Sequence, residues 1–338
     1  MRDDLLALLW CPDDHGTLRH EPGGRGGAGG GDGDGGEAAV CTTCGRRYPV
    51  LDGVLSFLTD VELPPLDRAE QQDRDQEATW YDSIWPEYID RIELPAHTEA
   101  LGHPGAPVLD LGCGPGRITE YLARDLGLST IGLDYSLESL RLLVRRCEGL
   151  PVLAVHGDGR ALPVRDGVLG GITSGQCYEH FRPDDRHRVL EECARTLRPG
   201  ARLAVTTLNY NLTFKLWKLK GNPGAKEGDH MYGSNFYYVR QTPSEYRAEL
   251  AAVFEDVEII GIRNFPVRSI TTGLRRVAGD RLAERFMGFM NRAGYRADRL
   301  LEHTPLAKAV GFLLLGVVSR PASPGEAPSA PSLAGTAP

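Results

Sequence analysis

The feature that most constrains the fold of this chain is a short glycine-rich segment at residues 108–117, V-L-D-L-G-C-G-P-G-R. Apolar residues surround Asp110, and glycines follow at positions 112, 114 and 116. A short apolar run that ends in closely spaced glycines predicts a buried parallel strand followed by a tight loop. Helical spacing of apolar residues resumes after Gly116. Strand, loop and helix in this order bring backbone N–H groups close to a ligand.

Beyond Pro107, strand-like and helix-like segments alternate along the chain. This alternation predicts an α/β fold with a Rossmann-like, seven-stranded, mostly parallel sheet and helices on both faces. The last strand is expected to be antiparallel and buried. The predicted strands cover residues 108–111, 129–133, 152–155, 171–174, 197–207, 254–262 and 308–320.

Polar side chains follow several of these strands. Asp134 ends the second strand, where a carboxylate can accept hydrogen bonds from both hydroxyls of a ribose. The fourth strand runs into Gln176, Tyr178, Glu179 and His180. Because ligands bind outside the carboxyl ends of the strands in open α/β sheets, we expect these side chains to face a ligand.

The segment D-L-G-C-G-P-G-R resembles the first motif of class I S-adenosylmethionine (SAM) methyltransferases. H-G-D-G-R-A-L-P-V at 156–164 and L-R-P-G at 197–200 also resemble segments of that family, so the resemblance spans roughly residues 105–210. It implies SAM as cofactor, with the loop around its methionine part and Asp158 at the adenine amino group. The cofactor contacts that it implies are Asp110, Gly112, Gly114, Gly116, Asp134, Tyr135, Asp158, Gly159 and Gln176.

Residues 1–58 form a smaller unit with its own cysteine pattern. Cys41 and Cys44 form a C-x-x-C followed by glycine, which is the turn of a zinc knuckle, and Cys11 lies upstream. A second C-x-x-C would need cysteine at position 14, where the chain has Asp14, so the fourth ligand is either Asp14 or His15. Alternatively, the unit has lost its metal and is held together by its small apolar core.

Residues 5–58 resemble the zinc-ribbon domain of the Trm112-like family. We therefore expect a small zinc-ribbon-like β domain before the α/β domain, with a flexible glycine-rich loop at 22–36. Residues 59–97 are predicted to form a linker and an N-terminal cap helix, with the helix over 78–92. Its aromatic residues either pack on the core, which is the preferred interpretation, or close over the ligand.

The methyltransferase domain is expected at residues 98–320, with insertions at about 208–240 and 267–303, and a disordered tail at 321–338. The first insertion contains the basic amphipathic stretch L-N-Y-N-L-T-F-K-L-W-K-L-K-G. It is interpreted as a substrate lid, a membrane-surface helix or a nucleic-acid contact. The lid is preferred because the stretch is short and the protein is acidic overall.

Charge and cysteine content restrict the classes of function that fit this chain. The net charge of -8 argues against general attraction to nucleic acid, and seven cysteines without a secretory signal indicate a reducing cytoplasm. These observations favour methyl transfer to a small molecule, such as a natural product or a lipid-like acceptor, with His180 as candidate general base. Two alternatives stay open: an RNA methyltransferase whose ribbon contacts nucleic acid, and a non-catalytic partner-binding module.

Overall fold

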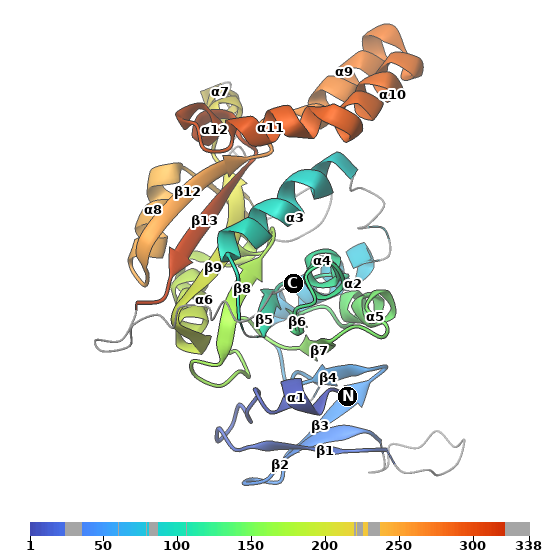
Figure 1. The fold of residues 1–338 in the computed structure, drawn as a ribbon, viewed down its shortest axis with the longest axis vertical. Helices are drawn as coiled ribbons and strands as arrows, with labels where there is room; N and C mark the ends of the chain where they lie inside the picture. The colour runs from blue at the N-terminus through green and yellow to red at the C-terminus, as the bar shows by residue number, and fades with distance from the viewer. Residues whose placement is uncertain are drawn as a thin grey trace, which may run out of the picture.

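The computed structural model describes residues 1–23, 36–59, 61–78, 80, 87–105, 107–219, 221, 226–228 and 237–321. Most of the predicted glycine-rich loop at 22–36 and of the tail at 321–338 therefore lies outside the described residues. A small β-ribbon occupies one end of the molecule, the central sheet stands in the middle, and a group of helices forms the other end (Figure 1).

The central sheet has the predicted seven strands, in the order β7-β6-β5-β8-β9-β13-β12. Its first five strands are parallel, and β13 is antiparallel to both of its neighbours. The strand bounds are β5 (Val108–Leu111), β6 (Thr130–Asp134), β7 (Val152–His156), β8 (Leu169–Ser174), β9 (Leu197–Asn209), β12 (Glu255–Ile262) and β13 (Leu313–Ser319). All four residues of β5 are buried, as expected for a parallel strand covered on both faces.

Helices cover both faces of the sheet, and each face has its own hydrophobic core. One core includes Val189 and Leu250, and the other includes Ile92 and Leu122. The helices are α3 (Glu87–Leu101), α4 (Arg117–Arg124), α5 (Leu137–Arg146), α6 (Pro183–Thr196) and α8 (Pro243–Ala251).

Local capping fixes where two of these helices begin. The Ser136 hydroxyl accepts a hydrogen bond from the Ser139 amide at the start of α5. At the start of α8, Thr242 and Glu245 cap each other reciprocally, as the T-P-S-E sequence predicts. Both starts are therefore encoded locally.

The N-terminal ribbon extends the central sheet. It comprises α1 (Asp3–Leu6), β1 (Leu18–Glu21), β2 (Ala38–Cys41), β3 (Arg47–Leu51) and β4 (Val54–Ser56). Its strands pair antiparallel in sequence order, and β4 then pairs parallel with β7, with Leu55 opposite Val155. Leu9 and Leu55 are fully buried in the core that also holds Val155. The ribbon and the α/β domain thus share one sheet and one core.

The helix predicted over residues 78–92 is wrong in its bounds. The structure has α2 (Pro65–Ala78) in a stretch whose polar, acidic sequence fits either a linker or a solvated helix, and α3 begins only at Glu87. Residues 79 and 81–86 lie outside the described part. Tyr88 and Ile89 of α3 are buried in the second core, which agrees with the packing interpretation of the aromatic stripe.

Both insertions contain helices. The first includes α7 (Leu212–Leu219), β10 (Glu227–Gly228) and β11 (Tyr238–Gln241), and β11 pairs parallel with β9. The second includes α9 (Val267–Ala278), α10 (Asp280–Phe289) and α11 (Tyr295–Leu301). The strand predicted over 308–320 is too long. Thr304 caps a short helix, α12 (Pro305–Val310), so β13 begins only at Leu313.

Candidate functional site

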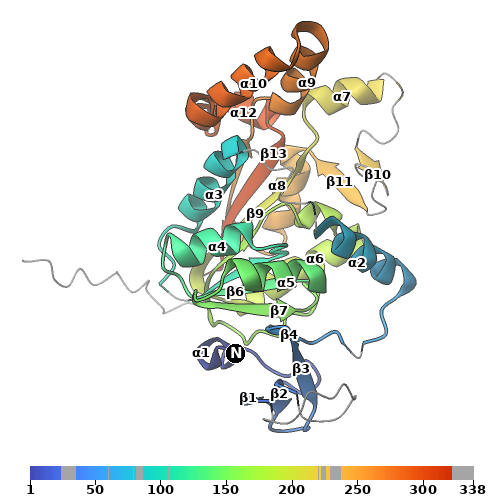
Figure 2. The same cartoon turned by 90° about the vertical axis from the view of Figure 1, so that its right-hand side faces the viewer.

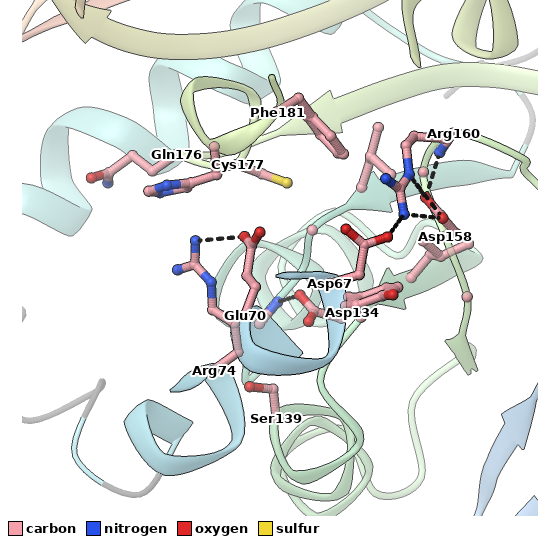
Figure 3. A pocket seen from close by; sticks show the side chains of 18 of the residues that line it. Asp67, Glu70, Arg74, Asp134, Ser139, Asp158, Arg160, Gln176, Cys177 and Phe181 are labelled. Carbon is pink, nitrogen blue, oxygen red and sulfur yellow. Dashed lines mark hydrogen bonds and ion pairs between the residues drawn. The ribbon is translucent and has the colours of Figure 1, made fainter. Parts of the chain in front are cut away.

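A cavity of about 520 Å³ lies where the carboxyl ends of β5, β6, β7 and β8 meet the glycine-rich loop. Helix α2 covers this opening and contributes seven lining residues, from Leu66 to Ala78. Figure 3 shows Asp67, Glu70 and Arg74 of α2 facing Asp134, Asp158 and Cys177 of the sheet side. A volume of this size is in the range of small-molecule sites, which is roughly 300–1,000 Å³.

The glycine-rich loop is shaped by backbone conformations that favour glycine. Gly112, Gly114 and Gly116 all have φ in the left-handed region, at 68°, 52° and 87°. A Cβ atom on Gly112 would come within 2.3 Å of the Cys177 Sγ, so the loop packs tightly against the end of β8. A Cβ on Gly114 would meet no atom within 4 Å, and Gly114 lines the cavity. The loop therefore presents bare backbone to a ligand.

Asp134 connects the loop to the second strand. One of its carboxylate oxygens accepts from the Gly114 amide at 2.7 Å, and the other accepts from the Ser136 amide at 2.8 Å. Burial raises the pKa of Asp134, and these backbone hydrogen bonds lower it by less. The pKa of Asp134 therefore lies above its usual value. Because a carboxylate has about four lone-pair sites, Asp134 can still accept from ligand hydroxyls.

Asp158, at the end of the third strand, forms an ion pair with Arg160, and the same guanidinium also contacts Asp67 of α2 at 2.6 Å. Burial lowers the pKa of Arg160, but the two carboxylates outweigh this effect and raise it. Arg160 thereby ties α2 to the strand end that is predicted to contact a nucleobase (Figure 3).

Seven of the nine predicted cofactor residues line the cavity: Gly112, Gly114, Asp134, Tyr135, Asp158, Gly159 and Gln176. The other two, Gly116 and Asp110, are not among the lining residues. Gly116 is the N-cap residue of α4 and has no side chain, so it makes no side-chain cap to the first turn of this helix.

Asp110 is buried, with an exposed fraction of 1%. One carboxylate oxygen accepts from the Thr119 hydroxyl at 2.6 Å, and Oδ1 has no hydrogen-bond partner among the described residues. Burial raises the pKa of Asp110 to about 7. An unpartnered buried carboxylate oxygen beside a ligand loop fits an ammonium group, because a positive charge would remove this desolvation penalty.

Gln176 is held in a strained backbone conformation at the end of β8, with φ of 55°. Its amide nitrogen donates to Glu93 of α3 at 3.0 Å, and Glu93 also forms ion pairs with Arg117 and Arg263. This buried network fixes Gln176 at the rim of the cavity.

His180, the predicted general base, lines the cavity beside Cys177. Its Nδ1 is 2.8 Å from the backbone oxygen of Tyr237. Because a carbonyl oxygen can only accept, Nδ1 carries the proton in the neutral ring and Nε2 carries the lone pair. Burial lowers the pKa of His180 well below its usual value. The neighbouring Glu179 is buried and, contrary to the prediction, does not line the cavity, and burial raises its pKa to about 7. Tyr178 does not line the cavity either, and its hydroxyl donates to Glu249 instead.

Sequence reasoning missed the contribution of α2, including Asp67, Glu70 and Arg74. The segment is polar and lacks a clear apolar stripe, so periodicity gave no sign of a buried face. The available signal was a proline at the first helical position followed by good helix formers such as Ala, Glu, Gln and Arg.

The N-terminal ribbon brings together a possible metal site from Cys11, Asp14, Cys41 and Cys44, whose ligand atoms all lie within 4.8 Å of one another. The Sγ atoms of Cys11 and Cys44 are 3.7 Å apart, and Asp14 Oδ1 is 3.3 Å from the Cys41 Sγ. Zn–S bonds of about 2.3 Å at tetrahedral angles place two thiolates about 3.8 Å apart. These four residues therefore fit a tetrahedral zinc ion.

The alternative fourth ligand, His15, is engaged elsewhere. Its ring stacks on Trp10 with the centroids 3.8 Å apart and the planes 3° from parallel. The geometry of the described ribbon therefore favours Asp14 over His15.

The sheet order, the glycine-rich loop and the acidic strand ends are those of a class I SAM-dependent methyltransferase domain. Residues 108–200 match the family model described as "Methyltransferase domain". Residues 108–200 are therefore similar to the methyltransferase domains of that family.

Two curated relatives show how far the likeness extends. A ubiquinone biosynthesis O-methyltransferase of Xanthomonas oryzae pv. oryzae is 32% identical over 140 residues, which cover 38% of this chain and 56% of that protein. A 2-phytyl-1,4-naphtoquinone methyltransferase of Thermosynechococcus vestitus is 32% identical over 146 residues, covering 40% and 60%. The chain thus spans little more than half the length of these relatives.

Among solved structures, the fold is similar to the complex between the Haloferax volcanii Trm112 methyltransferase activator and a putative methyltransferase. The TM-score is 0.50 at 20% identity, and the match covers 77% of this chain and 100% of that chain. This likeness supports the fold. In the part of the chain that the structure describes, no helix is long and apolar enough to cross a membrane.

Proposed function

We propose that this protein transfers a methyl group from SAM to a small-molecule acceptor. The observation that carries the proposal is the cavity itself, formed by a glycine-rich loop and acidic strand ends and covered by α2. Bound SAM would supply an activated methyl group on a sulfonium, which an acceptor atom takes by in-line displacement.

The residues of the cavity fit the parts of this cofactor. Asp134 would accept from the ribose hydroxyls and Asp158 from the adenine amino group, as in the family that the sequence resembles. The bare backbone at Gly114 and the amides at the start of α4 would receive the methionine carboxylate. Asp110 does not line the cavity, so its unpartnered oxygen would favour the ammonium group by its charge rather than by direct contact.

The protein itself would contribute in three ways. It would position the reacting groups, remove water from around them and accept a proton from the acceptor. Helix α2 would exclude water from the cavity, and the strand ends would hold the reacting groups in line. His180 would take the proton from an acceptor hydroxyl or amine through Nε2, because its Nδ1 is committed to the Tyr237 carbonyl. The acceptor atom would form its bond to the methyl carbon as the carbon–sulfur bond breaks, and a neutral thioether would leave.

A small acceptor, such as a natural product or a lipid-like molecule, is favoured by the size and cover of the cavity. The relatives named above are methyltransferases of quinone metabolism by their names, which supports the same class of acceptor. Tyr237 is a further wall of this site, since it lines the cavity and forms a hydrogen bond from its hydroxyl to Glu227 at 2.7 Å.

Calorimetric titration with SAM tests the proposal. The wild-type protein should bind one SAM per chain, and Asp134→Ala should weaken binding at least about tenfold, since it removes a charged acceptor worth roughly 1.5–3 kcal/mol. Asp125→Ala is the matched control, because Asp125 is an exposed carboxylate at the end of α4. Absence of SAM binding by the wild-type protein would refute methyl transfer.

The choice between a small molecule and RNA needs a second measurement. Filter binding to structured RNA at near-physiological salt should show no retention at micromolar protein, in keeping with the net charge of -8. Tight retention would instead favour the RNA alternative.

We also propose that Cys11, Asp14, Cys41 and Cys44 bind one zinc ion that stabilises the ribbon. Metal analysis of the purified protein should give about one zinc per chain. Asp14→Ala should lower zinc affinity and the melting temperature of the protein. Asp13→Ala is its control, because the Asp13 carboxylate pairs with Arg46. Equal zinc content and affinity in the two variants would remove Asp14 from the ligand set.

None of the seven cysteines, all of which the structure describes, takes part in a disulfide. This supports the proposal of a reducing compartment such as the cytoplasm.

A further inference from the structure

Helices α7, α9, α10, α11 and α12, here called the helical cap, form the end of the molecule opposite the β-ribbon (Figures 1 and 2). In the described part of the chain, fifteen large hydrophobic residues are exposed, and ten of them lie on these five helices. Monomeric soluble proteins rarely concentrate exposed apolar side chains at one place unless it is an interaction site. We therefore expect the helical cap to bind a partner.

Helix α7 shows most clearly that its apolar face points outward. Leu212, Leu216 and Leu219 recur at i, i+4 and i+7 on one side, and their exposed fractions are 55%, 51% and 84%. Phe214 lies on the opposite side of the helix and packs against the protein, with the Arg240 guanidinium 4.0 Å above its ring. Trp217 is also half exposed, at 51%.

Hydrogen bonds of Asn211, just before its first residue, fix the orientation of α7. Asn211 accepts from the Thr213 amide at 3.0 Å and donates its side-chain amide to the Gly311 carbonyl at 3.0 Å. These bonds hold the first turn of α7 against the segment between α12 and β13. The outward leucine face is thus a fixed surface of the fold.

Charge indicates which partner fits this surface. Residues 212–219 and 267–310 contain eleven Lys and Arg against four Asp and Glu, whereas the whole chain has 38 against 46. Two of those four acidic residues, Asp298 and Glu302, are buried and face inward. Lys215 and Lys218 flank the leucine face of α7 and are exposed. An acidic protein thus carries a basic, apolar end.

We infer that the helical cap docks on an anionic phospholipid surface. Leucine and tryptophan side chains would enter the boundary between headgroups and acyl chains, and the lysines and arginines would contact the lipid phosphates. A second copy of this chain is a poor occupant, because two basic ends would face each other. This inference is independent of the proposed methyl transfer, since it uses no residue that lines the cavity.

Co-sedimentation with vesicles tests the inference. Full-length protein should pellet with phosphatidylcholine vesicles that contain about 30% phosphatidylglycerol, and about tenfold less with phosphatidylcholine alone. The double variant Leu216→Glu/Leu219→Glu should lose most of the binding, and Lys215→Glu/Lys218→Glu should lose it most strongly at low salt. Leu126→Glu is the control, because Leu126 is an exposed leucine outside the cap, at 45%.

Circular dichroism melting must show that all variants are folded, which the exposure of the substituted side chains predicts. Failure of the wild-type protein to pellet with anionic vesicles would overturn the inference. So would equal binding by the Leu216→Glu/Leu219→Glu variant. A wild-type dimer in light scattering that this variant abolishes would show instead that the surface is a protein interface.

Discussion

At the scale of single residues, the site depends on a few groups whose surroundings fix their chemical state. The Tyr237 carbonyl sets the tautomer of His180, and burial keeps its ring neutral. Burial also raises the pKa of Asp110 to about 7. Both effects follow from contacts between segments that are far apart in sequence.

His180→Gln should lower the rate of methyl transfer about 10²–10⁴-fold, which is the usual contribution of a general base, with SAM affinity little changed. The pKa of His180 is well below its usual value, so the ring stays neutral near pH 6.5. Protonation of His180 should therefore cause no fall in the wild-type rate around that pH. The measurement is single-turnover release of S-adenosylhomocysteine across pH. His187→Gln, at an exposed position on α6, is the control. If His180→Gln transferred methyl groups at the wild-type rate, His180 would only line the cavity and would not be the base.

At the scale of elements, α2 is the part of the site that covers the cavity. It is attached by polar contacts. Gln71 donates to the Tyr135 carbonyl at 2.9 Å, and Asp75 accepts from the Ser136 hydroxyl at 2.5 Å and from the Glu138 amide at 3.2 Å. Few apolar side chains of α2 are buried, so these bonds largely determine its position.

Asp75→Ala should therefore loosen α2 and speed cofactor dissociation. The loss of charged hydrogen bonds at the start of α5 is worth roughly 1.5–3 kcal/mol, so we expect SAM affinity to fall about tenfold or more. Stopped-flow displacement of SAM measures the dissociation rate. Glu62→Ala, an exposed carboxylate just before α2, should leave the rate unchanged. Equal dissociation rates for both variants would mean that α2 does not gate the cavity.

At the scale of the whole molecule, the ribbon and the α/β domain fold as one body. The pairing of β4 with β7 continues the sheet, and the backbone carbonyls of Ala7 and Leu9 accept from Arg165 of the larger domain. The ribbon therefore protects an edge strand that would otherwise expose unpaired amides and carbonyls.

Removal of residues 1–58 should leave the edge of β7 open and expose the apolar residues beneath Leu55. We expect the shortened protein to aggregate in size-exclusion chromatography and to melt at a lower temperature. Co-expression of residues 1–58 as a separate chain should restore a soluble complex, because the pairing needs no covalent link. A stable, monomeric shortened protein would show that the ribbon is dispensable for folding.

The sequence by itself determined what depends on neighbouring residues. The left-handed glycines at 112, 114 and 116, the cap at Ser136 and the Thr242–Glu245 capping box are local, because each involves residues only a few positions apart. Buried parallel strands are equally readable, since they appear as short apolar runs. These features define the sheet and most of the cofactor site.

Only the tertiary structure decided how distant segments meet. It placed the polar helix α2 over the cavity, joined β4 to β7, brought Asp14 to the three cysteines, and turned the leucine face of α7 outward. A helix that is held by polar contacts does not show the regular spacing of apolar residues that reveals a buried face. The strand with which β4 pairs depends on which edge of the assembled sheet is open. Such choices depend on the assembled core, so no local pattern of residues specifies them.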